Sequence, residues 1–223
     1  MGNYCTRAKN ICSPDNEEII VRTLAVTWGR DAMILNGLLA NIDTILSRIT
    51  ESHLSRYDYL QRSLLITNVA SDGTYQSRFN GYYRMRQRSR DWYDFYFSIL
   101  EREKRNSEIS FREVLEEVYR AKRRVEPSFS SKLVATIRPE LPVYDRYVQG
   151  NLSLAIPRQN EPAETRMRKF ADIYSRLEVH MTRLVQTDAF RELKRRFDEK
   201  FSAYSHFTNV KKLDLLLWQY RQE

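Results

Sequence analysis

Glycine and proline are scarce in this chain, which contains only 6 of each among its 223 residues. A fold rich in β-strands needs many tight turns, and these two residues supply the backbone conformations of such turns. Their scarcity therefore favours long helices over a β-rich fold. Hydrophobic residues make up 42% of the chain and aromatic residues 12%, so a packed core is expected and a disordered chain is not.

Cysteine and long apolar runs are scarce as well. Cys5 and Cys12 are the only cysteines, and His53, His180 and His206 are scattered along the chain, which is not the spacing of metal ligands. We therefore expect neither a metal nor a cofactor. No signal-peptide core precedes the cysteines, and no apolar run approaches the roughly 20 residues that a membrane span requires. The sequence thus predicts a cytoplasmic protein with reduced thiols and no membrane partner.

Motifs of several large enzyme classes are also missing. No serine-hydrolase or dinucleotide-binding motif occurs, and nothing resembles the glycine-rich P-loop that ends in Gly-Lys-Ser or Gly-Lys-Thr. Gly73, Gly81 and Gly150 stand alone and are interpreted as turn residues. The sequence therefore gives no support to the common hydrolase and nucleotide-binding chemistries.

Positive charge is what the chain does have. Its 37 Lys and Arg residues exceed its 29 Asp and Glu residues, for a formal net charge of +8 and an isoelectric point near 9.5. Such a surface favours anionic partners, with nucleic acid first and an acidic membrane surface second. Arginine outnumbers lysine, and its planar guanidinium matches phosphate and the edge of guanine, although a GC-rich genome would enrich arginine equally. DNA is the expected partner, and the oligomeric state stays open.

Apolar residues recur at helical spacing along most of the chain, and the predicted fold is all-α, with eight to ten helices in an orthogonal bundle. Ser13 is expected to cap the first helix, and Ser110 and Glu113 form a capping box ahead of another. We expect a flexible tail at 1–12 and one helical domain at 13–223. One lobe would comprise residues 30–125, and the other would comprise residues 13–29 and 126–223. Further helices are expected at 31–49, 51–66, from about 91, behind Pro162, at 188–201 and at 208–220.

Arginines and aromatic residues are concentrated at 75–97. Residues 75–90 fit no regular helix, and in an extended strand Arg84, Arg86, Arg88 and Arg90 would place four guanidiniums on one side. Arginine neutralises phosphate, and aromatic rings stack on unpaired bases. The pattern is typical of nucleic-acid binding, although the same aromatics suit a helix core and the same arginines suit a solvated connection.

A second group of cations lies near the C-terminus. Phe190, Leu193 and Phe197 define the buried face of a predicted helix, and most of the cations fall on the opposite face. We interpret them as a solvated helix surface in preference to a surface that contacts DNA. The group consists of Arg191, Lys194, Arg195, Arg196, Lys200, Lys211 and Lys212.

Proline residues divide the segment 126–148 into short pieces. One helix is expected to end before it, residues 126–130 would form a tight connection, and 131–137 would form a second helix, which together make a helix–hairpin–helix. Backbone N–H groups at the start of the second helix favour a bound phosphate. The hydroxyl donors beside that helix start are Ser128, Ser130 and Ser131.

The same segment contains a lysine and an aspartate that stand out chemically. Pro142 suits the first position of a further short helix, which puts Asp145 about one turn inside it, where the positive end of the helix dipole would keep the carboxylate ionised. Lys132 lies on the second helix of the hairpin pair. Alternatively, Lys132 is a solvated lysine, and Asp145 caps a helix or pairs with Arg138 or Arg146.

These pieces resemble the motifs of the helix–hairpin–helix DNA glycosylases. That family carries a hairpin L-P-G-V-G-x-K and then P-V-D-x-x-V, and this chain has E-P-S-F-S-S-K, which ends at Lys132, and P-V-Y-D-R-Y-V, which contains Asp145. The resemblance implies a DNA glycosylase or AP lyase whose Lys132 attacks the sugar C1′ and forms a Schiff base. It also implies that Asp145 stabilises the sugar cation or activates the nucleophile, that the hairpin at Ser128 to Ser130 holds a DNA phosphate, and that an extruded base enters a cleft pocket.

The resemblance covers about a tenth of the chain and departs from the family at three points. Serines stand at both hairpin glycines, the stretch between Lys132 and Asp145 is shorter than usual, and Tyr144 is inserted before the aspartate. No iron–sulfur cysteine cluster follows, which excludes that subfamily. Glycine permits a closer backbone approach to phosphate than serine does. A non-catalytic nucleic-acid-binding protein and a helical protein-interaction module are therefore kept as alternatives.

Overall fold

A computed structural model describes residues 29, 31–85, 88–152, 154 and 156–220. All regular secondary structure within these ranges is helical, which confirms the all-α prediction. Residues 31–40 are helical, and the helices that follow bring the total close to the predicted eight to ten. They are α2 (Ile42–Arg48), α3 (Glu51–Leu64), α4 (Gly73–Tyr82), α5 (Arg90–Glu103), α6 (Phe111–Lys122), α7 (Pro127–Ile137), α8 (Arg146–Asn151), α9 (Ala163–Leu184), α10 (Asp188–Lys200), the 3₁₀ helix η1 (Ser202–Tyr204) and α11 (Asn209–Gln219).

The predicted N-terminal tail, the predicted lobes and the expected absence of a membrane span concern the organisation of the chain. The tail at 1–12 and the helix predicted from Ser13 lie outside the described residues. The division into lobes near residue 125 stays a prediction. None of the described helices combines the length and the apolar character that crossing a bilayer demands.

Short polar side chains begin most of the helices. Thr50, Thr187 and Thr208 each accept a hydrogen bond from the backbone N–H three residues later. Before α6, Ser110 and Glu113 form both bonds of the predicted capping box. Each cap satisfies a backbone donor that the helix itself leaves unpaired, and it contributes about 1 kcal/mol of stability.

The helix predicted for 31–49 is interrupted once. Asn41 lies in a turn between the helical residues 31–40 and α2. Its side-chain amide donates to the carbonyl of Gly37 at 2.9 Å. Asparagine competes for backbone hydrogen-bonding groups in this way, which explains why the break falls here.

Helix α4 occupies a stretch for which the sequence predicted no regular helix. Asp72 caps it by accepting a hydrogen bond from the Tyr75 N–H at 2.9 Å. Tyr75, Phe79 and Tyr82 follow at helical spacing, and all three are buried. The prediction is therefore wrong as far as Tyr82, because burial of three aromatic side chains outweighs the low helix propensity of the Asn-Gly pair within the helix.

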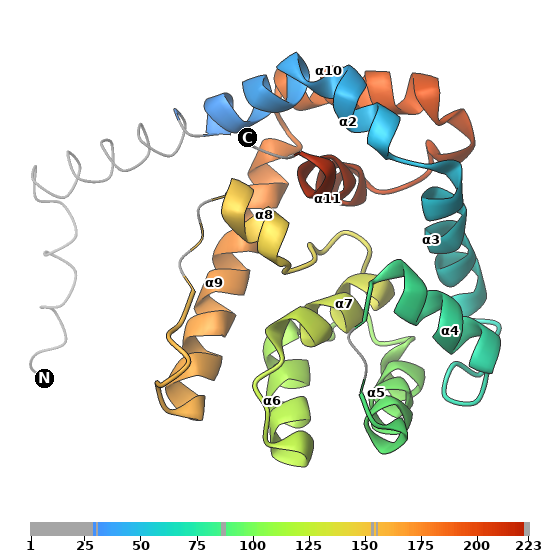
Figure 1. Ribbon diagram of the computed structural model, residues 1–223, viewed down its shortest axis with the longest axis vertical. Helices are drawn as coiled ribbons and strands as arrows, with labels where there is room; N and C mark the ends of the chain where they lie inside the picture. Colours follow the sequence, from blue (N-terminus) through green and yellow to red (C-terminus); the bar gives the residue numbers. More distant parts are fainter. Residues whose placement is uncertain (1–28, 30, 86–87, 153, 155, 221–223) are drawn as a thin grey trace, which may run out of the picture.

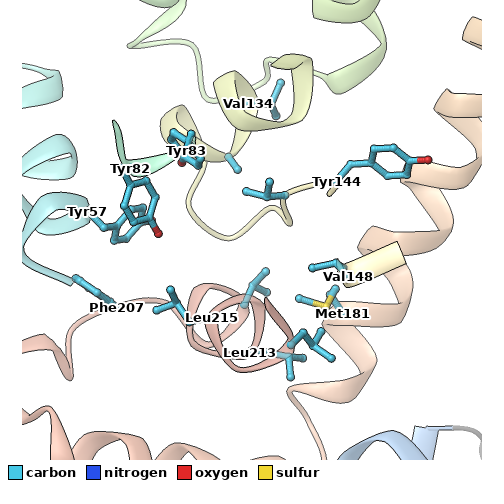
Figure 2. Close-up of a cluster of buried hydrophobic side chains, with 14 of the residues drawn as sticks. Tyr57, Tyr82, Tyr83, Val134, Tyr144, Val148, Met181, Phe207, Leu213 and Leu215 are labelled. Atoms are coloured by element: carbon cyan, nitrogen blue, oxygen red, sulfur yellow. The ribbon is translucent and has the colours of Figure 1, made fainter. Parts of the chain in front are cut away.

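The buried apolar side chains form one continuous core that positions helices α7 and α11. Helix α7 lies near the middle of the molecule and packs against α3, α5 and α6, whereas α11 packs against α2, α8, α9 and α10 (Figure 1). Figure 2 shows side chains from both groups in a shared cluster, including Tyr57, Tyr82 and Leu215. Full burial of one large apolar side chain contributes about 1.5–3 kcal/mol. The core therefore fixes α7 and α11 relative to each other.

Candidate functional site

A cavity of about 740 Å³ lies between the end of α4, helix α7, the start of α8, and helix α11. Lys132 and Asp145, the two residues predicted to carry the chemistry, both line it. Lys211, Asp214 and Trp218 of α11 line it as well. The cavity therefore has charged and aromatic walls and the volume of a small-molecule site.

The helix pair predicted for the hairpin is present, but its connection comes earlier in the chain. Helix α6 ends at Lys122, and Arg123 follows in the left-handed conformation with a φ of 53°. Helix α7 then begins at Pro127, so the connection comprises residues 123–126 and not 126–130. Proline has a fixed φ that suits the first position of a helix, which explains the early start.

The serines predicted to hold a phosphate consequently lie within α7. Ser130 and Ser131 are 0% exposed, and the Ser130 hydroxyl donates to the Glu126 carbonyl at 3.0 Å. A phosphate has no access to either hydroxyl, so the role predicted for Ser130 and Ser131 is wrong. Ser128, in the first turn of α7, lines the cavity and stays a candidate contact.

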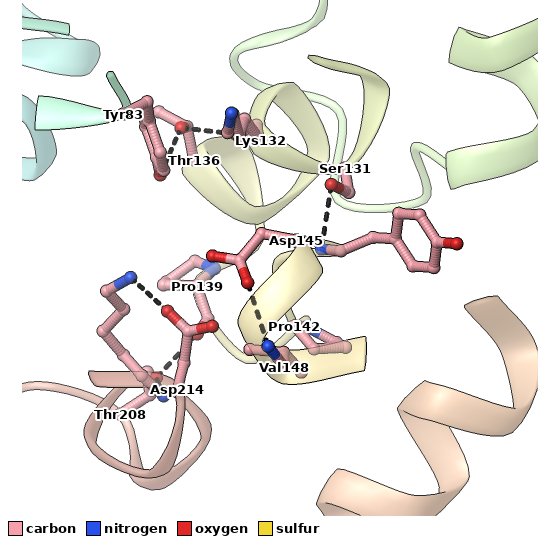
Figure 3. Close-up of polar contacts among 12 residues, drawn as sticks. Tyr83, Ser131, Lys132, Thr136, Pro139, Pro142, Asp145, Val148, Thr208 and Asp214 are labelled. Atoms are coloured by element: carbon pink, nitrogen blue, oxygen red, sulfur yellow. Dashed lines mark hydrogen bonds and ion pairs between the residues drawn. The ribbon is translucent and has the colours of Figure 1, made fainter. Parts of the chain in front are cut away.

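Ser131 has a structural role. Its Oγ accepts a hydrogen bond from the Tyr144 N–H at 3.0 Å and donates to the Ser128 carbonyl at 3.2 Å. Figure 3 shows this contact between α7 and the segment that precedes Asp145. Because Ser131 and Tyr144 are both buried, loss of the hydroxyl would leave a buried backbone donor without a partner.

Asp145 is the N-cap of helix α8. Its Oδ1 accepts hydrogen bonds from the backbone N–H groups of Tyr147 at 2.8 Å and Val148 at 3.0 Å. The helix therefore begins at Arg146 and not at Pro142, because the carboxylate satisfies its first free donors. The alternative prediction that Asp145 caps a helix is confirmed.

The pKa of Asp145 is raised above its usual range. Burial is the main cause, and the carboxylate of Asp214 adds to it. The N–H groups of Val148 and Tyr147 and the ammonium of Lys132 act in the opposite direction but do not outweigh these effects. On balance the site disfavours the ionised carboxylate, contrary to the prediction from the helix dipole, because desolvation penalises the charged form.

Lys132 interacts electrostatically with Asp145 across the cavity. The Lys132 ammonium lowers the pKa of Asp145, and the Nζ atom lies 5.5 Å from the centroid of the Phe129 ring. One turn further along α7, the hydroxyls of Thr136 and Tyr83 lie 3.0 Å apart and connect α7 to the residues that follow α4 (Figure 3). The two residues predicted from the sequence are thus brought to one cavity.

Sequence reasoning missed the pair formed by Lys211 and Asp214. Each is 6% exposed, and Lys211 Nζ lies 2.6 Å from Asp214 Oδ2. The rings of Tyr57 and Tyr82 lie 4.8 Å and 5.3 Å from the same Nζ. Burial alone would lower the pKa of Lys211, but Asp214 and the tyrosines raise it well above the usual range. The signal in the sequence is that these charges interrupt an otherwise apolar run from Val210 to Trp218.

Lys212 is also buried, on a different side of α11. It is 0% exposed, and its Nζ contacts Asp198 at 2.6 Å and the Ser205 carbonyl at 2.7 Å. The interpretation of the C-terminal cations as a solvated surface is therefore wrong for Lys211 and Lys212. It fits Arg191, whose side chain is 72% exposed.

Trp218 forms an aromatic wall of the cavity. His53 stacks on it with 5.7 Å between ring centroids and 14° between ring planes, and Tyr147 meets it edge-on at 5.9 Å. The guanidinium of Arg84 lies 4.6 Å from the centroid of the Trp218 ring. Burial, with nearby cations that include Lys211 and Arg84, lowers the pKa of His53 to about 4. The imidazole is therefore neutral at pH 7.

The arginines predicted to share one face of a strand do not lie on a strand. Arg84 lies in a turn after α4 with a φ of 47°, and Arg90 begins α5 with a side chain 95% exposed. Arg88 donates to a carboxylate oxygen of Glu126 at 2.9 Å. Arg86 lies outside the described residues. The strand prediction is wrong for the described arginines because α4 and α5 flank them on both sides, although Arg84 and Arg88 both line the cavity.

The cavity offers two amines, three carboxylates and aromatic walls, which suit nucleophilic attack and proton transfer. Within the described ranges, no three His, Cys, Asp or Glu side chains converge where they would hold a metal ion. No protein-family model, curated protein or solved structure matches this chain. A functional assignment therefore depends on the residues of the cavity.

Proposed function

We propose that this chain binds DNA and acts on it as a DNA glycosylase with AP lyase activity, with Lys132 as nucleophile and Asp145 as electrostatic partner. The observation that carries the proposal is that Lys132 and Asp145 line one cavity, although one belongs to α7 and the other caps α8. An amine and a partly buried carboxylate that line one cavity are the groups that this chemistry requires. The resemblance of residues 126–148 to the glycosylase motifs supports the same assignment.

The reaction begins with a neutral amine at Lys132. An N–H bond of the ammonium breaks, its proton passes to a base, and the freed electron pair attacks the sugar C1′. The bond between C1′ and the nucleobase breaks, and the departing base takes up a proton. Nζ then loses a second proton, the C1′–O4′ bond breaks, and O4′ takes up a proton, which leaves an iminium between C1′ and Nζ. The Asp145 carboxylate stabilises the positive charge that develops on the sugar.

The surroundings of the pair suit an extruded nucleotide. Arg84 and Arg146 line the cavity together with Lys132 and supply positive charge for phosphates, whereas Arg88 is paired with Glu126. Trp218 supplies an aromatic wall, packed between His53 and Arg84, against which a base can lie. The volume of about 740 Å³ lies within the range of roughly 300–1,000 Å³ that is common for small-molecule sites. Enzymes that act on a base must hold it outside the helical stack, which calls for such a pocket.

Borohydride trapping on DNA with an abasic site tests the proposal. Borohydride reduces the iminium to a stable amine, so a covalent protein–DNA complex is expected. Lys132→Ala should form none. Lys169→Ala should trap like the unmodified chain, because the Lys169 side chain is 47% exposed and pairs with Glu161. Absence of trapping, or equal trapping by Lys132→Ala, would contradict the assignment.

A non-catalytic nucleic-acid-binding protein is the second candidate, and the start of α7 favours it. Glu126 precedes this helix and pairs with Arg88 at 2.9 Å and Arg124 at 3.2 Å. A carboxylate thus occupies two cations at the place where a phosphate would bind. DNA affinity that falls steeply with salt, without trapping, would support this candidate. No affinity for DNA would leave a helical protein-interaction module.

A further inference from the structure

The Lys211–Asp214 pair lies on the cavity wall, and the attack of Lys132 on the sugar makes no direct use of it. A buried ion pair contributes little net stability, because the loss of hydration offsets the attraction between the charges. Apolar side chains of similar size would fill the same space in α11. A buried charged pair beside a cavity is therefore a candidate for function.

The geometry connects this pair with Asp145. The carboxyl groups of Asp145 and Asp214 point toward one another in Figure 3. Both backbone N–H bonds of the α8 cap go to Asp145 Oδ1, so Oδ2 lies outside the cap. Asp214 is fixed on its other side by Lys211 Nζ, 2.6 Å from Oδ2 of Asp214. Asp145 thus lies between Lys132 on one helix and a fixed carboxylate on another.

We propose that Asp214, held in place by Lys211, is a positioning residue that makes Asp145 the proton acceptor of the reaction. Lys211 holds the Asp214 side chain through their ion pair at 2.6 Å, and it supplies the opposite charge that a buried carboxylate needs. The Asp214 carboxylate in turn places negative charge beside Asp145. A nearby like charge favours a proton on one of the two carboxylates. Asp214 is already paired with Lys211, so Asp145 is the carboxylate that accepts the proton.

This proton transfer rests on the proposed function, because it belongs to the attack of Lys132 on the sugar. An N–H bond of the Lys132 ammonium breaks, and its proton forms an O–H bond on Asp145. The electron pair left on Nζ attacks C1′. The protonated Asp145 returns the proton to the departing base, which restores the carboxylate as positive charge develops on the sugar. The charged groups that face Asp145 are Lys132 from α7, Asp214 with Lys211 from α11, and Arg146 next to it on α8. Burial and Asp214 raise its pKa, which makes it a stronger base.

The test compares Asp214→Asn with Asp198→Asn. Both changes remove the carboxylate partner of a buried lysine, Lys211 in one case and Lys212 in the other, so both variants share the loss of a buried pair. The titration of Asp145 is followed by the carbon-13 resonance of its carboxyl group, assigned with Asp145→Asn. We expect Asp214→Asn to lower the Asp145 pKa and to reduce the trapping rate at neutral pH by about tenfold for each unit of that decrease. Asp198→Asn should leave the Asp145 pKa and the trapping rate unchanged.

The outcomes separate this inference from the proposed function. If the unmodified chain forms no trapped complex, the glycosylase assignment fails, and the titration still decides whether Asp214 acts on Asp145. If trapping occurs but Asp145 titrates alike in the unmodified chain and in Asp214→Asn, this inference alone is overturned. Should Asp214→Asn not fold, the double variant Lys211→Met with Asp214→Leu removes both charges and provides the same comparison.

Discussion

The hydroxyl of Ser131 accepts a hydrogen bond from the backbone N–H of Tyr144 at 3.0 Å, and this contact joins helix α7 to the segment that leads into Asp145. Ser131 precedes Lys132 directly, and Tyr144 precedes Asp145 directly. One buried hydrogen bond thus connects the immediate neighbours of the two residues that line the cavity. The position of Asp145 relative to Lys132 depends on it.

Ser131→Ala should therefore reduce both stability and trapping. The Tyr144 N–H would be buried without a partner, which costs about 1–3 kcal/mol of unfolding free energy. Chemical denaturation measures this loss. Ser98→Ala is the control, because the Ser98 hydroxyl donates to a carbonyl of its own helix at an exposed position. Equal effects from both changes would show that the Ser131 contact has no special role.

Asp145→Asn should separate the chemistry of this residue from its capping role. Asparagine caps helices as well as aspartate does, so the Asn variant should be more stable than Asp145→Ala by about 0.5–2 kcal/mol at every pH. Both variants should lose trapping, because neither side chain carries a negative charge. An Asn variant that traps as well as the unmodified chain would show that Asp145 serves only as a cap.

The stability of Asp145→Asn relative to the unmodified chain should also depend on pH. Burial and Asp214 raise the pKa of Asp145 in the folded state, so the folded chain holds this proton more tightly than the unfolded chain. The contribution of Asp145 to stability is therefore greatest below its unfolded pKa and is lost as pH rises through the folded pKa. The Asn variant should gain stability relative to the unmodified chain over that window. A constant difference between the two denaturation curves would contradict the raised pKa.

His53 should be neutral down to about pH 4 in the folded chain, since burial and the nearby cations lower its pKa to that value from an ordinary 6.5. Below pH 6.5 the unfolded chain binds a proton that the folded chain does not. The stability should therefore fall as the pH decreases from 6.5 to about 4. The loss attributable to this residue is about 3 kcal/mol at most. The imidazole proton resonance measures the pKa directly, and His53→Gln should lack this part of the pH dependence. Protonation near pH 6.5 would contradict the packing of His53 against Trp218.

Arg84→Gly and Arg123→Gly form a matched pair. Both arginines have a positive φ, 47° and 53°, and each guanidinium lies over an aromatic ring, Trp218 at 4.6 Å and Tyr119 at 5.9 Å. Glycine adopts this backbone conformation without the roughly 1–2 kcal/mol that other residues pay. Neither variant should therefore lose more than about 1 kcal/mol of stability. Only Arg84→Gly should weaken DNA binding and reduce the dependence on salt by about one unit of slope, because only Arg84 lines the cavity. Equal DNA binding by the two variants would show that DNA does not contact the cavity at Arg84.

Local patterns in the sequence predict much of the fold. The apolar spacing of Phe170, Tyr174, Leu177 and Met181 predicts the long helix α9, and all four are buried there. The capping box at Ser110 forms as predicted. These features depend on residues within one or two turns of each other, and such neighbours are adjacent in the sequence.

The rest of the site depends on residues that are distant in the chain. Lys211 is buried because Asp214 neutralises it and because Tyr57 and Tyr82, which come more than a hundred residues earlier, surround its ammonium. Ser131 is predicted to contact phosphate, yet its partner is Tyr144 N–H. The direction of the pKa shift of Asp145 likewise follows from burial and from Asp214. Tertiary packing sets each of these properties, and no local pattern contains them.

The identity of the lysine that carries the sugar tests the proposed role of Lys132 most directly. After borohydride reduction, the trapped complex is digested with a protease, and mass spectrometry locates the modified residue. The cavity contains two lysines, Lys132 and Lys211, of which Lys211 is held by Asp214 at 2.6 Å. We expect the adduct on Lys132. An adduct on Lys211, or on lysines outside the cavity, would contradict the role of Lys132 as the nucleophile.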